Sequence, residues 1–275
     1  MSSPRTARAL LVVACCTLVA CGRGDNGSAE SPHTEIEAAA AKRYRVEVVE
    51  THPHDPEAFT QGLTFDDSSV LWEGTGLVGR SQLRRIVPET GEVEVVQNLP
   101  ESVFGEGLAI GPEGFVQLTW QQRRAYRWSY DARDDLGTFT YDGEGWGLTY
   151  DGTQFIQSDG SATLTFRDPS DFTVVKTLPV TIDGEPLDQL NELEWVDEMV
   201  WANVWHSDTI VGIDPGSGEV AATVDASGLW ADSARTQEMT LNGIAHRPGD
   251  PPTRLWLTGK LWPTLFVVDL VEVQP

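Results

Sequence analysis

The stretch Phe104–Leu108 (FGEGL) decides the fold, because a version of it opens five β-rich segments of the chain. The shared element is a tripeptide whose middle residue is usually glycine and whose last residue is leucine or isoleucine. Counted from Gly62, the steps along the chain are 45, 40, 45 and 51 residues. Periods of about 40–45 residues are typical of a β-propeller with one four-stranded blade per repeat. The tripeptides are Gln61-Gly62-Leu63, Glu106-Gly107-Leu108, Trp146-Gly147-Leu148, Asn191-Glu192-Leu193 and Asn242-Gly243-Ile244.

Short alternating runs of hydrophobic and polar residues follow each tripeptide, separated by turn sequences such as Asp-Gly and Pro-x-x-Gly. This pattern predicts antiparallel strands joined by tight turns, four to a repeat. The last repeat has material for only three strands, but Tyr44–Thr51 offers a fourth at the other end of the chain. We therefore predict an all-β, five-bladed propeller whose ring is closed where Tyr44–Thr51 pairs with Leu265–Leu270. A β-sandwich is the structural alternative, although it does not require a repeating tripeptide. The last and longest step, from Glu192 to Gly243, predicts a loop or short helix over 226–239.

The N-terminus has the features of an export signal. Arg5 and Arg8 precede the apolar run Ala9–Ala20, which is too short to span a bilayer. The sequence Leu18–Cys21 (LVAC) resembles the lipobox of bacterial lipoproteins, in which Cys21 would be acylated. We therefore predict a lipoprotein-type signal peptide over 1–20, a flexible tether over 21–43 and a propeller domain over 44–275. The expected location is the cell envelope, with Cys21 as the only membrane anchor. An ordinary signal peptide cut near Ala20, which would give a secreted soluble protein, is the alternative.

Composition excludes several classes of site. All three cysteines lie within residues 1–21, so the domain itself has no disulfide, thiol nucleophile or cysteine-based metal site. The formal net charge of −23 repels nucleic acid and anionic lipid head groups, so neither is an expected partner. A propeller with closed sheet edges gives no reason to expect an oligomer, and we predict a monomer.

In a propeller, the first residues of the tripeptides gather at one end of the inner strands. Those five positions, which form the predicted site, hold one carboxylate, that of Glu106. Strand ends should add Trp120, Trp205 and Lys260 to the same mouth. An indole there can bind an apolar surface and still donate its N–H, whereas most tryptophans in a propeller pack between blades. The other ring positions are Gln61, Trp146, Asn191 and Asn242.

Metal chemistry is not suggested by these residues. The five histidines form no pair with ligand spacing, and a calcium-dependent site would need several carboxylates in the ring. The sequence also has no Gly-x-Ser-x-Gly elbow, phosphate loop or dinucleotide fingerprint. We therefore predict that no cofactor is required. The sequence does not decide whether a structural cation is bound in the central channel.

Eight ordered motifs between His52 and Leu270 give the chain a specific family resemblance. It resembles the plant and bacterial type of glutaminyl-peptide cyclotransferase, a five-bladed propeller unrelated to the zinc-dependent animal enzymes. The motifs are Phe59–Leu63 (FTQGL), Phe104–Leu108 (FGEGL), Leu118–Trp120 (LTW), Gly145–Leu148 (GWGL), Leu190–Glu194 (LNELE), Ala202–Trp205 (ANVW), Leu241–Ala245 (LNGIA) and Thr258–Pro263 (TGKLWP).

The resemblance implies conversion of the N-terminal glutamine of peptides and proteins into pyroglutamate, with release of ammonia. The family's functional positions fall on Gln61, Glu106, Trp120, Trp146, Asn191, Trp205 and Lys260, with no departure at any of them.

The substrate already carries the α-amine nucleophile and the γ-carbonyl electrophile, so ring closure needs a folded conformer and proton transfers. We hypothesise that Glu106 is general base and then general acid, with a raised pKa among tryptophans. Lys260, with Asn191 or Gln61, would stabilise the oxyanion. The three tryptophans would fold the glutamine side chain and exclude water.

The sequence alone is also compatible with two other functions. One is a non-catalytic propeller that binds peptides or sugars through an aromatic funnel, in which Glu106 would be a buried structural carboxylate. The other is a metal-dependent, lactonase-like hydrolase. The sequence does not define the natural substrate or the preferred second residue.

Overall fold

The computed structural model describes residues 41–231, 233 and 235–274. The predicted signal peptide, Cys21 and most of the predicted tether lie outside these residues. All regular elements among the described residues are β-strands, so the fold is all-β as predicted. In this part of the chain we find no helical segment with the length and hydrophobicity of a membrane span.

Three antiparallel sheets of four strands follow one another along the chain, each with its strands in sequence order. Each sheet starts at or beside one of the first three tripeptides. The first comprises β2 (Thr60–Phe65), β3 (Leu71–Thr75), β4 (Gln82–Val87) and β5 (Glu92–Asn98). The second comprises β6 (Gly105–Gly111), β7 (Gly114–Thr119), β8 (Arg124–Trp128) and β9 (Asp135–Thr140). The third comprises β10 (Leu148–Tyr150), β11 (Phe155–Gln157), β12 (Thr163–Arg167) and β13 (Val174–Pro179), and a small hairpin of β14 (Thr181–Ile182) and β15 (Glu185–Pro186) follows it.

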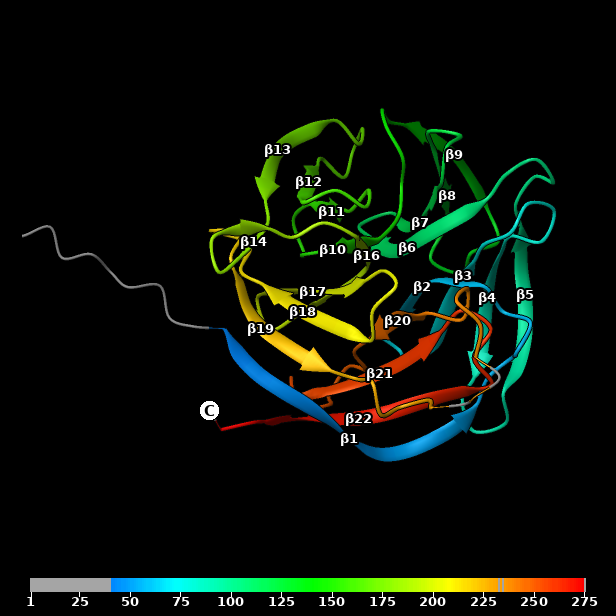
Figure 1. Cartoon of the computed structure of the whole chain (residues 1–275). Helices are drawn as coiled ribbons and strands as arrows, with labels where there is room; N and C mark the ends of the chain where they lie inside the picture. The colour runs from blue at the N-terminus through cyan, green and yellow to red at the C-terminus, as the bar shows by residue number, and fades with distance from the viewer. Residues whose placement is uncertain (1–40, 232, 234, 275) are drawn as a thin grey trace, which may run out of the picture. The chain divides into compact units, whose positions relative to one another are not determined.

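The remaining strands form one sheet of eight, in the order β16-β17-β18-β19-β1-β22-β21-β20. The N-terminal strand β1 pairs antiparallel with β22, with Val46 opposite Leu270 (Figure 1). It also pairs in parallel with β19 from Lys42 to Arg45, a contact that the sequence did not predict. The strands are β16 (Leu190–Val196), β17 (Met199–Val204), β18 (Thr209–Ile213), β19 (Val220–Asp225), β20 (Leu241–Ala245), β21 (Arg254–Gly259), β22 (Thr264–Glu272) and β1 (Lys42–Pro53). Between β19 and β20 the described residues form turns without a helix.

The glycines of the first three tripeptides are explained by how closely these inner strands approach one another. The strands β2, β6, β10, β16 and β20 contact each other in cyclic order. A Cβ at Gly62 would lie 2.4 Å from the backbone nitrogen of Leu108, and one at Gly107 would lie 2.5 Å from that of Leu148. Only glycine allows this approach without displacing backbone.

The fourth tripeptide has Glu192 where the others have glycine. Its carboxylate is fully buried and accepts the backbone N–H groups of Leu63 at 3.1 Å and Ile244 at 2.8 Å. Burial raises the pKa of Glu192 well above its usual range, the nearby Glu194 raises it further, and the two N–H donors oppose the shift. Glu192 therefore joins β16 to β2 and β20 across the centre.

The hydrophobic core of the described residues is divided into clusters that lie between successive groups of strands. One cluster joins Leu63 and Phe65 of β2 to Trp256 of β21, and another joins Trp72 of β3 to Phe115 of β7. Three further clusters also join the strands of neighbouring groups around the centre. Burying side chains between neighbouring sheets holds the inner strands in place, and with them the site at their N-terminal ends.

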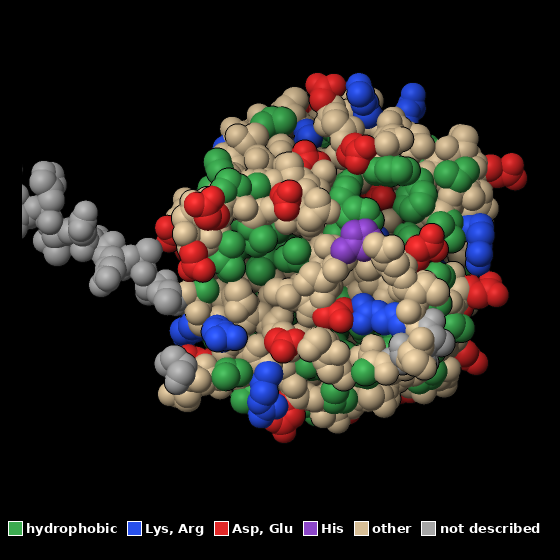
Figure 2. Space-filling model, viewed as in Figure 1, with side chains coloured by type: hydrophobic (Ala, Val, Ile, Leu, Met, Phe, Trp, Pro, Cys, Tyr) green, Lys and Arg blue, Asp and Glu red, His purple; other side chains and the backbone are tan. Residues whose placement is uncertain are grey.

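Acidic side chains are scattered over the visible face of the domain rather than gathered into one patch (Figure 2). This distribution agrees with a solvated acidic exterior.

Candidate active site

A cavity of about 480 Å³ lies where the inner strands begin. Seven of the eight predicted catalytic and substrate-binding residues line it. Six further residues that were not among the predicted site residues line the same cavity: Phe59, Leu77, Phe104, His206, Gln237 and Glu238. The seven predicted residues are Gln61, Glu106, Trp120, Trp146, Asn191, Trp205 and Lys260.

Glu106 and Lys260 are the two buried ionisable groups of the cavity, each with 5% of its surface exposed. Burial raises the pKa of Glu106 well above its usual range, an effect that the Lys260 charge opposes and the Glu144 charge reinforces. Burial also lowers the pKa of Lys260 to about 8, against the attraction of Glu106. Desolvation therefore outweighs the mutual attraction of the two groups, and both are driven toward their neutral forms. A carboxyl group whose pKa is raised in this way is a stronger base than a free carboxylate and is suited to accepting and returning a proton.

The amide side chains of the site divide into two kinds. Asn242 is fully buried and does not line the cavity. Its Nδ2 group donates to the Gln61 Oε1 atom at 3.2 Å and to the Thr60 carbonyl at 2.8 Å. It therefore orients Gln61, with the Gln61 Nε2 group left as the donor. By contrast, the Asn191 Oδ1 atom is buried without a hydrogen-bond partner in the described structure, so it can accept a bond from a ligand N–H.

Aromatic rings form a wall around the cavity. Phe104 meets Phe59 and Trp120 edge to face, with ring centroids 5.9 and 5.8 Å apart. On the other side Trp146 and Trp205 are 5.2 Å apart, also edge to face. The Lys260 ammonium lies 5.1 Å from the centre of the Phe59 ring. Such a wall presents apolar surface to a side chain of a few carbons and excludes water around the buried carboxyl group.

Glu106 is the one carboxylate of the five tripeptide positions, and two further acids stand at the site outside those positions. Glu238 lines the same cavity, and Glu144 accepts hydrogen bonds from the indoles of Trp120 and Trp146. Neither acid was predicted, because both stand outside the tripeptides. Glu144 belongs to a run rich in glycine and acid, Asp142–Gly145, which indicates only a turn. Glu238 falls in the long connection before β20, where the sequence has no repeating signal.

No group of three or more histidine, cysteine, aspartate or glutamate side chains in the described residues is arranged to hold a metal ion.

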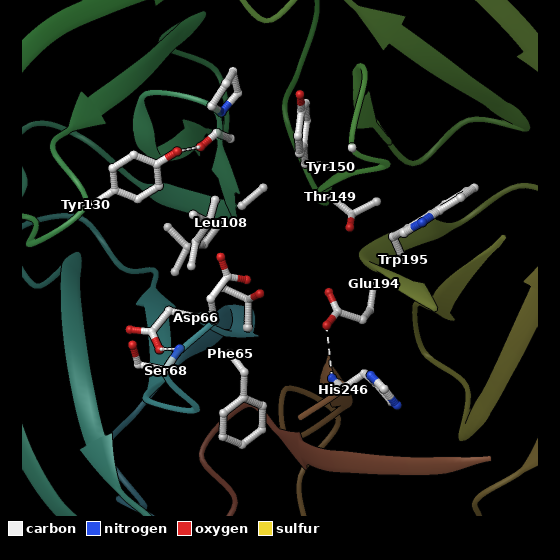
Figure 3. A pocket seen from close by; sticks show the side chains of 17 residues that line it. Phe65, Asp66, Ser68, Leu108, Tyr130, Thr149, Tyr150, Glu194, Trp195 and His246 are labelled. Atoms are coloured by element: carbon white, nitrogen blue, oxygen red, sulfur yellow. Dashed lines mark hydrogen bonds between the residues drawn. The ribbon is translucent and has the colours of Figure 1, made fainter. Parts of the chain in front are cut away.

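A second cavity, of about 550 Å³, lies at the other end of the inner strands (Figure 3). Phe65, Glu194 and Trp195 line it, and they come from the C-terminal ends of β2 and β16. Glu194 accepts the His246 backbone N–H at 2.9 Å, and burial raises its pKa to about 8 against this bond. None of the predicted site residues lies here, so the predicted chemistry belongs to the first cavity.

The fold and the first cavity define a β-sheet enzyme site built on one buried carboxyl group, one buried amine and a wall of indoles. The chain belongs to the glutamine cyclotransferase family, whose sequence pattern matches residues 18–270. It is 38% identical over 236 residues to a glutaminyl-peptide cyclotransferase of Arabidopsis thaliana, covering 83% of this chain and 72% of that protein. It is also similar to the crystal structure of a Myxococcus xanthus glutaminyl cyclase, with a TM-score of 0.77 and 37% identity, covering 85% of this chain and all of that one.

Proposed function

We propose that this protein cyclises the N-terminal glutamine of peptides and proteins to pyroglutamate and releases ammonia. The observation that carries the proposal is the buried pair of Glu106 and Lys260 inside an aromatic cavity of about 480 Å³. The family membership and the names of the two relatives point to the same reaction.

The reaction requires the glutamine side chain to fold back onto its own α-amine. The amine nitrogen attacks the side-chain carbonyl carbon, a carbon–nitrogen bond forms, and Glu106 takes a proton from the attacking nitrogen. Glu106 then gives that proton to the carboxamide nitrogen, whose bond to carbon breaks as ammonia leaves. Since an α-amine has a pKa of about 8, part of the substrate is neutral at working pH. A single carboxyl group is then enough to carry the proton from the amine to the leaving nitrogen.

The other cavity residues take supporting roles. Lys260 and the Gln61 Nε2 group are the donors for the oxyanion of the tetrahedral intermediate. The unpartnered Oδ1 of Asn191 suits an N–H of the substrate. Trp120, Trp146 and Trp205 hold the folded side chain and keep water out of the cavity.

The proposal is tested by measuring ammonia release from a Gln-Xaa peptide. The wild-type protein should release ammonia with or without EDTA, and Glu106→Gln should lose about 10²–10⁴-fold in rate. Glu185→Gln is the matched control, since Glu185 is exposed on the β14–β15 hairpin and should leave the rate unchanged. If the wild type releases no ammonia, the cyclase proposal is wrong and the alternative of a non-catalytic binding protein is favoured. If activity is lost in EDTA, the reaction depends on a metal ion and the proposed proton shuttle by Glu106 alone is wrong.

For the architecture, we propose a five-bladed β-propeller that β1 closes by pairing with β22. The support is the cyclic order of the five inner strands and the antiparallel register of β1 with β22. In this arrangement β1 is the outer strand of the last blade. Deleting residues 42–53 should then prevent folding, and a folded, active product would contradict the proposed closure.

For the location, we propose a cell-envelope lipoprotein anchored through Cys21, on the strength of the LVAC sequence alone. Cys21→Ser should abolish incorporation of labelled fatty acid and release the protein from the membrane fraction. A protein that is unlabelled in the wild type would support the secreted alternative. We also propose a monomer, to be checked by light scattering.

A further inference from the structure

Glu144 lies in the connection between the second and third sheets and joins the indoles of Trp120 and Trp146 through hydrogen bonds. The Trp120 Nε1–H donates to the Glu144 Oε2 atom at 2.7 Å, and the Trp146 Nε1–H donates to the same atom at 3.0 Å. Hydrogen bonds to a carboxylate are shorter and stronger than those between neutral groups. Because both bonds end on one oxygen, neither ring can rotate without losing a charge-assisted contact.

Glu144 is itself held from several directions. Its other oxygen, Oε1, accepts from the Gln121 side chain at 2.9 Å, and its backbone carbonyl accepts from the Gln157 side chain at 2.9 Å. The next residue, Gly145, donates its backbone N–H to the Trp120 carbonyl at 3.0 Å. These contacts come from the end of β7 and the end of β11, so the carboxylate has a fixed position relative to both sheets.

The carboxylate completes the aromatic wall. Phe59, Phe104 and Trp120 form one series of ring contacts, and Trp146, Trp205 and His206 form another. Among the described residues no ring contact joins Trp120 to Trp146. The two series are instead joined through the Glu144 carboxylate.

Trp120 needs this support more than its neighbours do. It is 39% exposed, the most exposed tryptophan of the cavity wall, whereas a ring packed in a core is fixed by its surroundings. An exposed indole without a polar partner would sample several rotamers, and ordering it on substrate binding would cost entropy.

We propose that Glu144 is a positioning residue, which fixes the Trp120 and Trp146 indoles so that the cavity is preformed for the folded glutamine side chain. This inference rests on the proposed function. Glu144 does not take part in the chemistry, and it acts on substrate binding through the two rings. A simpler role would be to stabilise the turn between β9 and β10, and the experiment must separate these two roles.

The experiment compares Glu144→Ala and Glu144→Gln in the full chain, with Glu185→Ala as a surface control. Alanine removes both acceptors, so KM for a Gln-Xaa peptide should rise about tenfold or more, with a smaller change in kcat. Glutamine keeps an amide oxygen that can still accept from both indoles, so Glu144→Gln should recover most of the loss. A merely structural role would instead lower the thermal midpoint without this split between KM and kcat.

The decisive arm repeats Glu144→Ala in a Trp120→Phe/Trp146→Phe background. Phenylalanine keeps an aromatic ring but has no N–H, so Glu144→Ala should have no further effect on KM there. Acrylamide quenching of tryptophan fluorescence gives a readout independent of turnover, and it should increase in Glu144→Ala but not in Glu144→Gln. An equal rise of KM in both backgrounds, or quenching that does not change, would overturn the proposal. If the wild type releases no ammonia, the proposed function fails, while the quenching result still decides whether Glu144 holds the indoles.

Discussion

The Arg84 guanidinium donates to the Glu73 Oε2 atom at 2.6 Å in a buried cluster of polar and charged side chains. The other Glu73 oxygen accepts from Thr60 at 2.6 Å and lies 3.1 Å from the His54 Nε2 atom. His54 in turn contacts the carbonyl of Trp262 at 2.7 Å. The cluster thus connects the residue before Gln61 to the segment that follows Lys260, and so supports both sides of the cavity.

Glu73→Gln should destabilise the domain severely, because it removes the fully buried carboxylate from Arg84 and leaves only the part-exposed Asp55 to pair with that buried charge. Breaking a buried ion pair typically costs about 3–5 kcal/mol. Urea unfolding at pH 7 measures the effect, with Glu94→Gln as the control. Glu94 forms an ion pair with Arg85 that is nearly half exposed, so its loss should cost less than about 1 kcal/mol. Equal effects of the two substitutions would contradict the structural role of the cluster.

The same cluster predicts how stability depends on acid. Burial alone would raise the pKa of Glu73, but the Arg84 and His54 charges lower it to about 2. A carboxyl group with a depressed pKa stabilises the folded state above its unfolded pKa, near ~4.3, and loses this contribution as pH falls toward the folded value. The stability difference between wild type and Glu73→Gln should therefore shrink between about pH 4 and pH 2.

Glu106 predicts the opposite pH dependence. Its pKa is raised by burial, so the folded protein binds a proton more tightly than the unfolded chain does. The stability that this proton contributes is complete below the unfolded pKa and is lost as pH rises through the folded value. Glu106→Gln should therefore melt close to the wild type at pH 4 and above it at pH 8. Thermal unfolding of both proteins at the two pH values is the measurement, and a variant that melts below the wild type at pH 8 would contradict a desolvated carboxyl group.

Much of this site could be predicted because the repeating tripeptide fixes both the inner strands and their polar ends. Gly62 and Gly107 stand where a side chain would clash with the neighbouring strand, so the repeated glycine can be recognised in the sequence. The residues that precede these glycines therefore occupy equivalent positions on their strands. Asn242 shows the limit of this logic: it occupies the fifth ring position, yet it lies behind Gln61 and orients it. The repeat gives the position of a residue along the strand, but packing against its neighbours decides whether its side chain reaches the cavity.

The features that were not predicted depend on contacts between distant segments. The parallel pairing of β1 with β19 involves Lys42 and Ala222, which no turn connects. Glu144 is a similar case, since its importance arises from two indoles brought together by different sheets.

Lys260 should contribute to the rate as well as to binding. Lys260→Met removes the buried cation but keeps the alkyl stem, so the oxyanion loses a donor and kcat should fall roughly 10²–10³-fold. Because the pKa of Lys260 is about 8, kcat of the wild type should also decline as pH rises above that value, where the ammonium is lost. Lys176→Met is the control, since Lys176 is exposed on β13 and lies outside the cavity. A fall in kcat of less than tenfold in Lys260→Met would show that Lys260 does not stabilise the oxyanion.

Glu144 and Glu106 are coupled through charge as well as through the cavity wall. Three groups act electrostatically with Glu106. Lys260 lowers its pKa and Glu144 raises it, while the pKa of the Tyr141 phenol, raised chiefly by burial, is raised further by Glu106. Since Glu144→Gln removes a negative charge and keeps an acceptor for the indoles, it should lower the pKa of Glu106 while leaving Glu106 buried. Infrared difference spectra between each protein and its Glu106→Gln counterpart isolate the carboxyl band of Glu106, and its titration midpoint should move to lower pH in the Glu144→Gln background. A midpoint that stays fixed would show that burial and the Lys260 charge set the proton affinity of Glu106, and that Glu144 contributes to the site only through the two indoles.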